Sequence, residues 1–224
     1  MSDEASQPPV IAIDGPSASG KGTVAQRVAR ELGFHYLDSG SLYRLVALAA
    51  RKRGVSLNDE AALAALAQTL RAEFQGDEII LEGVRVTEQI RAENCASDAS
   101  KVAAFPKVRQ ALLSMQRAFR ERPGLVAEGR DMSSTVFPDA KLKVFLTASP
   151  EVRAGRRYKQ LKEKGMYASI PTLLQEIKER DARDSERPVA PLRQAAGAGL
   201  LDTTALTVEQ AVAEVITRYR ALVI

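Results

Sequence analysis

Cysteine, histidine and tryptophan are scarce in this sequence of 224 residues, which has one cysteine, one histidine and no tryptophan. The lone thiol of Cys95 cannot form a disulfide within the chain, and there are too few cysteines and histidines for a structural zinc site. With His35 as the single imidazole, the sequence also argues against general-base catalysis by histidine. The chemistry is therefore expected to depend on other side chains.

Long apolar runs are missing as well. No stretch approaches the roughly 18 apolar residues that a membrane-spanning helix requires. Residues 1–9 are acidic and polar and carry no apolar core, so we expect no secretory signal peptide there. Together with the single cysteine, these absences predict a cytoplasmic protein without a membrane partner.

The positive charge is concentrated in one segment. The net charge is +4, from 32 basic and 28 acidic residues. Residues 151–193 contain 11 basic and seven acidic residues, so the whole excess lies there. A local excess of this kind indicates an anionic ligand. The excess is small, and only Tyr158 and Tyr167 in this segment could stack on bases, so we expect no nucleic-acid partner.

Segments with strand and helix patterns alternate along most of the chain. Five apolar segments predict strands: residues 10–14, 34–37, 125–128, 142–147 and 200–201. Apolar residues at helical spacing lie between them, which predicts an α/β fold with a parallel sheet and helices on both faces. Residues 72–86, with turn glycines at Gly76 and Gly83, break this rhythm and predict a small antiparallel ribbon in an insert.

A glycine-rich turn joins the first predicted strand to the first predicted helix. Its residues are Gly15, Pro16, Ser17, Ala18, Ser19, Gly20, Lys21, Gly22 and Thr23. In this context such a loop binds phosphate groups through its backbone N–H groups, and its lysine reaches the β- and γ-phosphates of a nucleotide. We therefore predict a P-loop NTPase-type sheet and assign the loop to the phosphates of ATP.

The residue after Lys21 distinguishes between classes of phosphate-loop protein. Gly22 stands where the strict motif has the Ser or Thr whose hydroxyl binds Mg²⁺. This variant is typical of nucleoside monophosphate kinases, so we expect no metal ligand in the protein and Mg²⁺ held by phosphates and water. A GTPase would carry an N-K-x-D string, which is absent, and the strand at 142–147 ends in Thr147 rather than in the acidic residue of many ATPases.

Five motifs, in order and at matching spacing, carry a family resemblance. They are residues 10–23 (VIAIDGPSASGKGT), 37–44 (LDSGSLYR), 100–109 (SKVAAFPKVR), 129–132 (GRDM) and 177–192 (IKERDARDSERPVAPL). Nearly from end to end, the sequence resembles the bacterial-type cytidylate kinases. The resemblance implies a nucleotide-binding core at residues 1–40, 101–150 and 191–224, a monophosphate-binding insert at 41–100 and a helical lid at 151–190.

The resemblance also implies which residues bind the acceptor, CMP or dCMP. It assigns Ser39, Arg44, Arg130 and Arg187 to the phosphate, Arg180 and Asp184 to the ribose, and Ser100, Arg109 and Asp131 to the base. The chemistry agrees, because guanidinium groups match phosphate oxygens, and an ionised Asp131 accepts from the cytosine amino group and repels the uracil oxygen. Arg180, Asp184 and Arg187, at positions i, i+4 and i+7, are predicted to share one helix face.

A second set of arginines is assigned to the donor. Arg153, Arg156 and Arg157 are predicted to lie on one helix face and to close over the phosphates of ATP. The residues expected to stabilise the transferring phosphoryl group, with Mg²⁺ as cofactor, are Lys21, Arg130 and Arg187. The acceptor phosphate, with a second pKa of about 6, is mostly ionised at neutral pH, so no general base is needed.

Three alternatives remain open: a kinase for another acceptor such as UMP, a nucleic-acid-binding protein, and a nucleotide-binding switch without turnover. Asp131 argues against UMP, a steep salt dependence would reveal nucleic-acid binding, and a switch would carry the missing guanine motif. The sequence departs from the family pattern at Lys101, at residues 133–135 (SST) and at Pro188. We expect a monomer with small-molecule partners only.

Overall fold

The computed structural model describes residues 7–76, 78–163 and 165–223; most of the predicted polar N-terminal segment lies outside this part of the chain. The chain divides into two compact units. Unit 1 comprises Met1–Leu37 and Ala118–Ile224, and unit 2 comprises Asp38–Arg117. The insert predicted at 41–100 falls within unit 2, and the segment predicted as a lid falls within unit 1.

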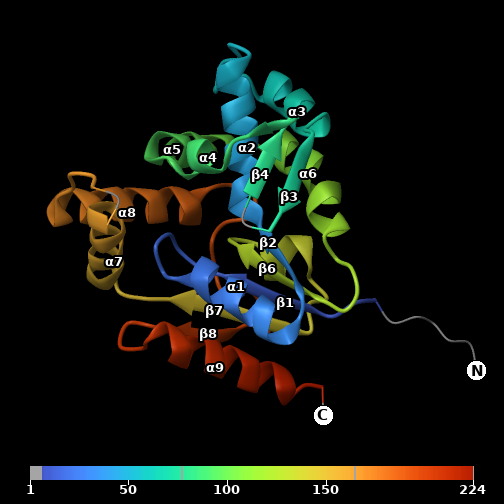
Figure 1. The fold of residues 1–224 in the computed structure, drawn as a ribbon, viewed down its shortest axis with the longest axis vertical. Coiled ribbons are helices and arrows are strands. Elements are labelled where there is room, and N and C mark those ends of the chain that lie inside the picture. The colour runs from blue at the N-terminus through green and yellow to red at the C-terminus, as the bar shows by residue number, and fades with distance from the viewer. Residues whose placement is uncertain (1–6, 77, 164, 224) are drawn as a thin grey trace, which may run out of the picture. The chain divides into compact units, whose positions relative to one another are not determined.

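A five-stranded sheet forms the centre of unit 1, in the order β2-β6-β1-β7-β8 (Figure 1). Its strands are β1 (Val10–Asp14), β2 (His35–Asp38), β6 (Leu125–Gly129), β7 (Leu142–Thr147) and β8 (Gly199–Asp202). β1 pairs in parallel with β6 and β7, and β8 pairs in parallel with β7. The predicted α/β class is confirmed. Because β1 and β6 are parallel neighbours, their carboxyl ends meet at one edge of the sheet.

Two helices pack against this sheet, α1 (Lys21–Leu32) and α9 (Val208–Arg220). Their apolar faces share one buried core with residues of β1, β6, β7 and β8. Gly33 caps the end of α1 with a positive φ of 66°, and the N–H of Phe34 donates to the carbonyl oxygen of Ala29 at 2.8 Å. Phe34 thus completes the helix terminus, and the next strand begins at His35, one residue later than predicted.

Two further helices of unit 1, α7 (Pro150–Glu163) and α8 (Ile170–Glu186), pack against each other (Figure 1). The contact is a small apolar core formed by Ala154, Leu161, Leu173 and Ile177. The Ser169 side chain caps α8 by accepting from the N–H of Thr172. Of the helices in the described part of the chain, none is long and apolar enough to cross a membrane.

The prediction that Arg180, Asp184 and Arg187 share one helix face is wrong for Arg187. α8 ends at Glu186, and Arg187 has an extended backbone with φ −61° and ψ 139°. Pro188 explains this, because a proline disfavours helical geometry in the residue before it. Arg180 and Asp184 lie on the helix, whereas Arg187 lies beyond its end.

Unit 2 combines helices with a three-stranded antiparallel sheet, in the order β3-β4-β5. Its elements are α2 (Ser39–Lys52), α3 (Glu60–Gln68), β3 (Ala72–Gln75), β4 (Glu78–Leu81), β5 (Val84–Arg85), α4 (Thr87–Arg91), α5 (Glu93–Val102) and α6 (Pro106–Ala118). The predicted antiparallel ribbon is confirmed, with Gly76 and Gly83 at positive φ in its turns. α4 and α5 were not predicted; their caps lack a side-chain hydrogen bond, so the usual start signal is missing.

Candidate active site

The predicted phosphate loop leaves the carboxyl end of β1 and ends at the first turn of α1. The N–H of Gly15 donates to the carbonyl oxygen of Gly129 on β6 at 3.3 Å. A Cβ on Gly15 would lie 2.0 Å from the carbonyl oxygen of Leu146, so only glycine fits there. Ala18 and Gly20 have positive φ values of 56° and 92°. Such left-handed positions let successive N–H groups turn toward one anion.

Lys21 is buried at the start of α1 and faces a carboxylate that the sequence reading missed. Its Nζ lies 3.5 Å from Oε2 of Glu128 and donates to the carbonyl oxygen of Pro16 at 3.4 Å. Glu128 is itself buried near the end of β6, and its Oε1 accepts from the Tyr36 hydroxyl at 3.5 Å. The ammonium group is thus held beside the loop by a counter-ion from the adjacent strand.

Glu128 also explains the glycine after Lys21. A Cβ on Gly22 would lie 3.2 Å from Oε1 of Glu128, a tight contact. The acidic residue sought at the end of the strand 142–147 is present instead on β6, the other neighbour of β1. An apolar run ending in an acidic residue, LVAE at 125–128, was the signal that could have found it.

A second missed carboxylate, Asp14, precedes the loop directly. It is buried and accepts from the N–H groups of Met132 and Ser133, each at 2.8 Å, and from the Ser133 hydroxyl. Burial raises the pKa of Asp14 above its ordinary value, although these hydrogen bonds oppose the rise. Met132–Val136 forms a π-helical turn. Asp14 therefore ties the phosphate-loop strand to the segment that follows Asp131.

Four predicted acceptor-binding residues of unit 1 lie together: Arg130, Asp131, Asp184 and Arg187, here called the acceptor cluster. Nε of Arg130 donates to Oδ2 of Asp184 at 2.7 Å, and Nη2 of Arg187 lies 3.9 Å from Oδ1 of Asp131. Burial alone would raise the pKa of Asp184, but Arg130, with Arg180 and Arg187, lowers it. Burial alone would lower the pKa of Arg130, but Asp184 raises it. These opposing effects keep both groups ionised.

The three arginines predicted to contact ATP have protein partners in the structure. Arg153 is buried and forms an ion pair with Asp181, with Nη2 and Oδ2 at 2.5 Å. Arg156 donates to the carbonyl oxygens of Ser19 and Thr203. Arg157 donates to the side chain of Gln160 at 3.3 Å. Asp181 and Thr203 were not singled out by the sequence.

Two predicted acceptor-binding residues lie on α2 in unit 2. Ser39 is the first residue of the helix and is buried, next to the capping residue Asp38. Arg44 lies one to two turns further and donates from Nη1 to the carbonyl oxygen of Ile90 at 3.0 Å.

The other two predicted acceptor-binding residues of unit 2, Ser100 and Arg109, lie on α5 and α6. Ser100 is half-buried on α5. Arg109 is buried on α6, donates to the carbonyl oxygen of Ala103 at 3.1 Å and lies over the ring of Tyr43, 5.6 Å from its centroid. A guanidinium on an aromatic face keeps a defined orientation, which suits recognition of a planar base.

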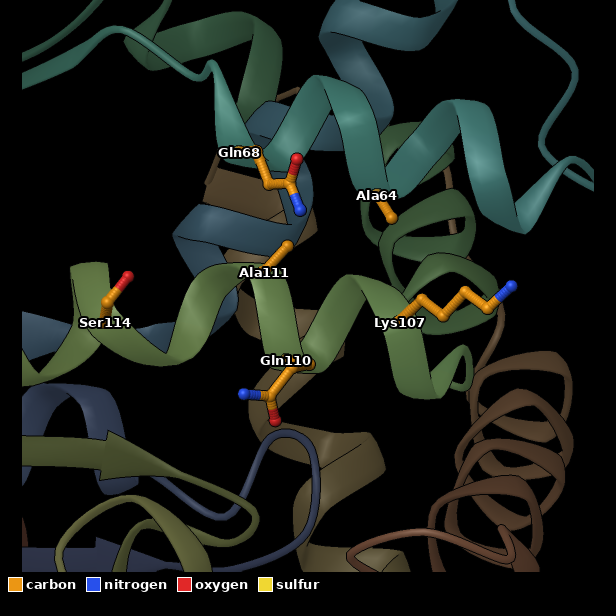
Figure 2. Close-up of a pocket in the computed structure, with 6 residues that line it drawn as sticks. All are labelled: Ala64, Gln68, Lys107, Gln110, Ala111 and Ser114. Atoms are coloured by element: carbon orange, nitrogen blue, oxygen red, sulfur yellow. The ribbon is translucent and has the colours of Figure 1, made fainter.

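A pocket of about 470 Å³ opens between α3 and α6 (Figure 2). Its lining residues are Ala64, Gln68, Lys107, Gln110, Ala111 and Ser114. None of them was predicted to bind a substrate, and only Lys107 among them carries a charge. The predicted substrate residues of unit 2 do not line this pocket, and we assign it no role.

Comparison with known proteins points to one family. The sequence model described as cytidylate kinase matches residues 11–221. A cytidylate kinase from Bordetella bronchiseptica is 56% identical over 221 residues, 99% of each chain, and one from Chromobacterium violaceum is 61% identical over 208 residues, 93% of this chain and 94% of the relative. A solved gluconokinase from Sinorhizobium meliloti 1021 covers 96% of this chain and 93% of its own at 18% identity and a TM-score of 0.48, too weak a likeness for any inference. The two sequence matches span nearly the whole length, and this chain therefore belongs to the cytidylate kinase family of nucleoside monophosphate kinases.

Proposed function

We propose that this protein transfers the γ-phosphoryl group of ATP to CMP and dCMP. The observation that carries the proposal is the edge of the sheet where β1 and β6 end. β1 continues into the phosphate loop, β6 continues into Arg130 and Asp131, and the N–H of Gly15 donates to the carbonyl oxygen of Gly129. A donor loop and an acceptor-binding segment on adjacent parallel strands suit direct transfer between two bound phosphates.

For the donor, we propose that the loop N–H groups and Lys21 bind the phosphates of ATP. The left-handed backbone at Ala18 and Gly20 and the N-terminus of α1 support this, because both favour an anion. Direct contact of ATP with Arg153, Arg156 and Arg157 stays a prediction from the sequence.

For the acceptor, we propose that Arg130 and Arg187 bind the phosphate and that Asp131 accepts from the cytosine amino group. Asp131 is buried, and its carboxylate would repel a uracil oxygen placed against it. Asp184 and Arg180 are assigned to the ribose, which leaves CMP and dCMP both as substrates. The assignments of Ser39, Arg44, Ser100 and Arg109 in unit 2 to CMP stay predictions.

Mg²⁺ is proposed to enter with ATP. In the described ranges, no three His, Cys, Asp or Glu side chains are placed to hold a metal by themselves. The buried hydroxyls of Ser17 and Ser19 have no hydrogen-bond partner among the described residues, so they fit a phosphate oxygen or a metal-bound water. When bound, Mg²⁺ neutralises charge on the β- and γ-phosphate oxygens.

The remaining parts of the proposal concern the chain as a whole. We propose that residues 151–190 act as a lid that excludes water, with residues 41–100 as the insert for the monophosphate. Because the acceptor phosphate is ionised at neutral pH, the reaction proceeds without a general base. A cytoplasmic location and a monomeric state remain predictions from the sequence.

A coupled assay of ADP release tests the proposal, with Mg·ATP and CMP, dCMP, UMP, AMP, GMP or no acceptor. We expect fast turnover with CMP and dCMP, slow turnover with UMP and none without an acceptor. Equal rates with CMP and UMP would remove Asp131 as the base reader. Turnover that does not depend on any acceptor would contradict the kinase assignment itself.

A further inference from the structure

Two arginines of α7 contact the phosphate loop through its carbonyl oxygens. Nη1 of Arg153 donates to the carbonyl oxygen of Ser17 at 3.2 Å, and Nη1 of Arg156 donates to that of Ser19 at 2.9 Å. In a trans peptide group the C=O and the N–H point in opposite directions. The N–H groups of Ala18 and Gly20 therefore point away from the two guanidinium groups, which leaves them directed as an anion-binding loop requires.

The position of Arg153 is determined by its other partners. Its Nε donates to the carbonyl oxygen of Ala148 at 3.0 Å, and Nη1 and Nη2 donate to the two carboxylate oxygens of Asp181 at 3.0 and 2.5 Å. Only 3% of Arg153 is exposed. With the bond to Ser17, the planar guanidinium makes four hydrogen bonds and is held in one orientation. Asp181 of α8 supplies the negative charge that balances it.

Arg156 is anchored to the end of the sheet instead. Nη1 and Nη2 donate to the hydroxyl and the carbonyl oxygen of Thr203, at 3.1 and 2.6 Å. Thr203 follows β8 directly, and its N–H donates to the carbonyl oxygen of Thr147 on β7 at 2.8 Å. The contact between Arg156 and the carbonyl oxygen of Ser19 is thus positioned by β7 and β8.

The loop conformation between these contacts needs such support. Ala18 has a φ of 56°, in the left-handed region. Residues other than glycine keep this conformation only when the surrounding structure imposes it. Its side chain packs against the apolar core shared by α7 and α8. The strained residue therefore lies between two peptide groups held by arginines and against the helices that carry them.

We propose that Arg153 and Arg156 are positioning residues that brace the phosphate loop, and that Asp181 holds Arg153 in that place. The brace keeps the N–H groups of Ala18 and Gly20 directed at the phosphates before the nucleotide arrives. For these two arginines, this role is the alternative to the direct phosphate contact predicted from the sequence. It rests on the proposed function in one respect, that the loop binds the phosphates of ATP.

The variant Asp181→Asn separates a brace from direct phosphate contact. If Arg153 touched the phosphates, removal of the competing carboxylate would tighten anion binding. If Arg153 braces the loop, loss of its ion-pair partner loosens the loop and weakens binding, by about tenfold for one charge-assisted hydrogen bond. Calorimetric titration of the whole chain with inorganic tripolyphosphate, without acceptor, measures this change. Arg153→Lys, which keeps the charge but loses the fork, is expected to weaken binding as much or more.

The controls keep failure of the brace distinct from failure of the proposed function. Glu209→Gln removes an exposed ion pair between α9 and Arg27 of α1, and it should leave tripolyphosphate affinity unchanged. Lys21→Ala should weaken binding if the loop is the phosphate site; unchanged binding would contradict the proposed function. If Lys21→Ala weakens binding and Asp181→Asn leaves it unchanged or tightens it, the brace is overturned.

Steady-state kinetics and thermal unfolding complete the test. The brace predicts that Asp181→Asn raises the KM for ATP by about tenfold while the KM for CMP stays the same. A variant that is merely less stable would lose melting temperature without this split between the two substrates. Equal changes in both KM values would therefore also count against the brace.

Discussion

The phosphate loop and the acceptor cluster of unit 1 both carry positive charge, but they hold it differently. In the loop, Lys21 lies 3.5 Å from Glu128, and the proposed anion site also includes backbone N–H groups. In the cluster, Arg130 lies 2.7 Å from Asp184, and both side chains are largely buried. A backbone site requires a strained conformation held by its surroundings, whereas a site of buried ions requires counter-ions of its own. Their responses to single substitutions should therefore differ in kind.

The largest effect is expected for Lys21→Ala in the loop. The ammonium group is the one full charge that the loop itself offers to the β- and γ-phosphates, so turnover should fall by at least about 10³-fold. The chain should still fold, although Glu128 loses a counter-ion and some stability is lost with it. ADP-release assays and thermal unfolding measure the two quantities, with the exposed Lys141→Ala as control. Near-normal turnover would contradict the assignment of the loop.

The second effect is a loss of stability, expected when the acceptor cluster loses one of its counter-ions. Asp184→Asn leaves Arg130 buried without its ion-pair partner, and we expect a loss of about 3 kcal/mol in the free energy of unfolding. Asp139→Asn, which breaks an exposed pair with Arg120, should cost about 1 kcal/mol or less. Denaturant titrations compare the two variants. Equal losses of unfolding free energy would mean that the buried ion pair contributes no more to stability than the exposed one.

The same carboxylate predicts how stability depends on pH. The pKa of Asp184 is lowered in the folded protein because the arginine charges outweigh burial. Its stabilisation is therefore present above the unfolded pKa of about 4 and is lost as the pH falls through the lower folded pKa. Wild type should lose stability over this acid range more steeply than Asp184→Asn, which chemical denaturation at several pH values can measure.

A third, smaller effect concerns specificity within the cluster. Asp131→Ala removes the acceptor for the cytosine amino group, so the preference for CMP over UMP should fall by roughly tenfold or more. The KM for ATP should stay within about twofold, because the loop is unchanged. Ratios of kcat/KM for the two acceptors, measured at saturating ATP, give the result. An equal loss of CMP use and of ATP binding would be evidence against base reading.

The smallest loss of stability is expected at the contact between Asp14, just before the phosphate loop, and Ser133, just after the Arg130–Asp131 segment. Ser133→Ala removes the hydroxyl that donates to Asp14, while the N–H groups of Met132 and Ser133 remain as donors. We expect a loss of about 1 kcal/mol in stability. The neighbouring Ser134→Ala, at an exposed position, is the matched control and should be neutral. If both variants unfold alike, the hydroxyl contributes nothing to this junction.

Local patterns carried most of the predictions that proved right. The strand before Gly15 and the helix after Gly20 each depend on residues close in sequence. The turn glycines of the antiparallel ribbon belong to the same class. Such features follow from backbone geometry and hydrogen bonds between near neighbours, which a sequence displays directly.

Predictions failed or fell short where the partner lies far along the chain. Glu128 and Asp14 were missed because their importance comes from Lys21 and Ser133, more than 100 residues away. Arg187 was placed on a helix that Pro188 ends. The spacing of Arg153 and Arg156 predicted a shared helix face, but it did not reveal that both side chains donate to carbonyl oxygens of the loop.

By itself, the sequence determined the α/β class, the phosphate loop and the family, because these are written in contiguous motifs. Only the tertiary structure decided which charges face each other: Lys21 with Glu128, Arg130 with Asp184 and Arg153 with Asp181. The physical reason is that a local motif sets backbone direction and side-chain type. The pairing of buried charges depends instead on which strands and helices become neighbours when the sheet assembles.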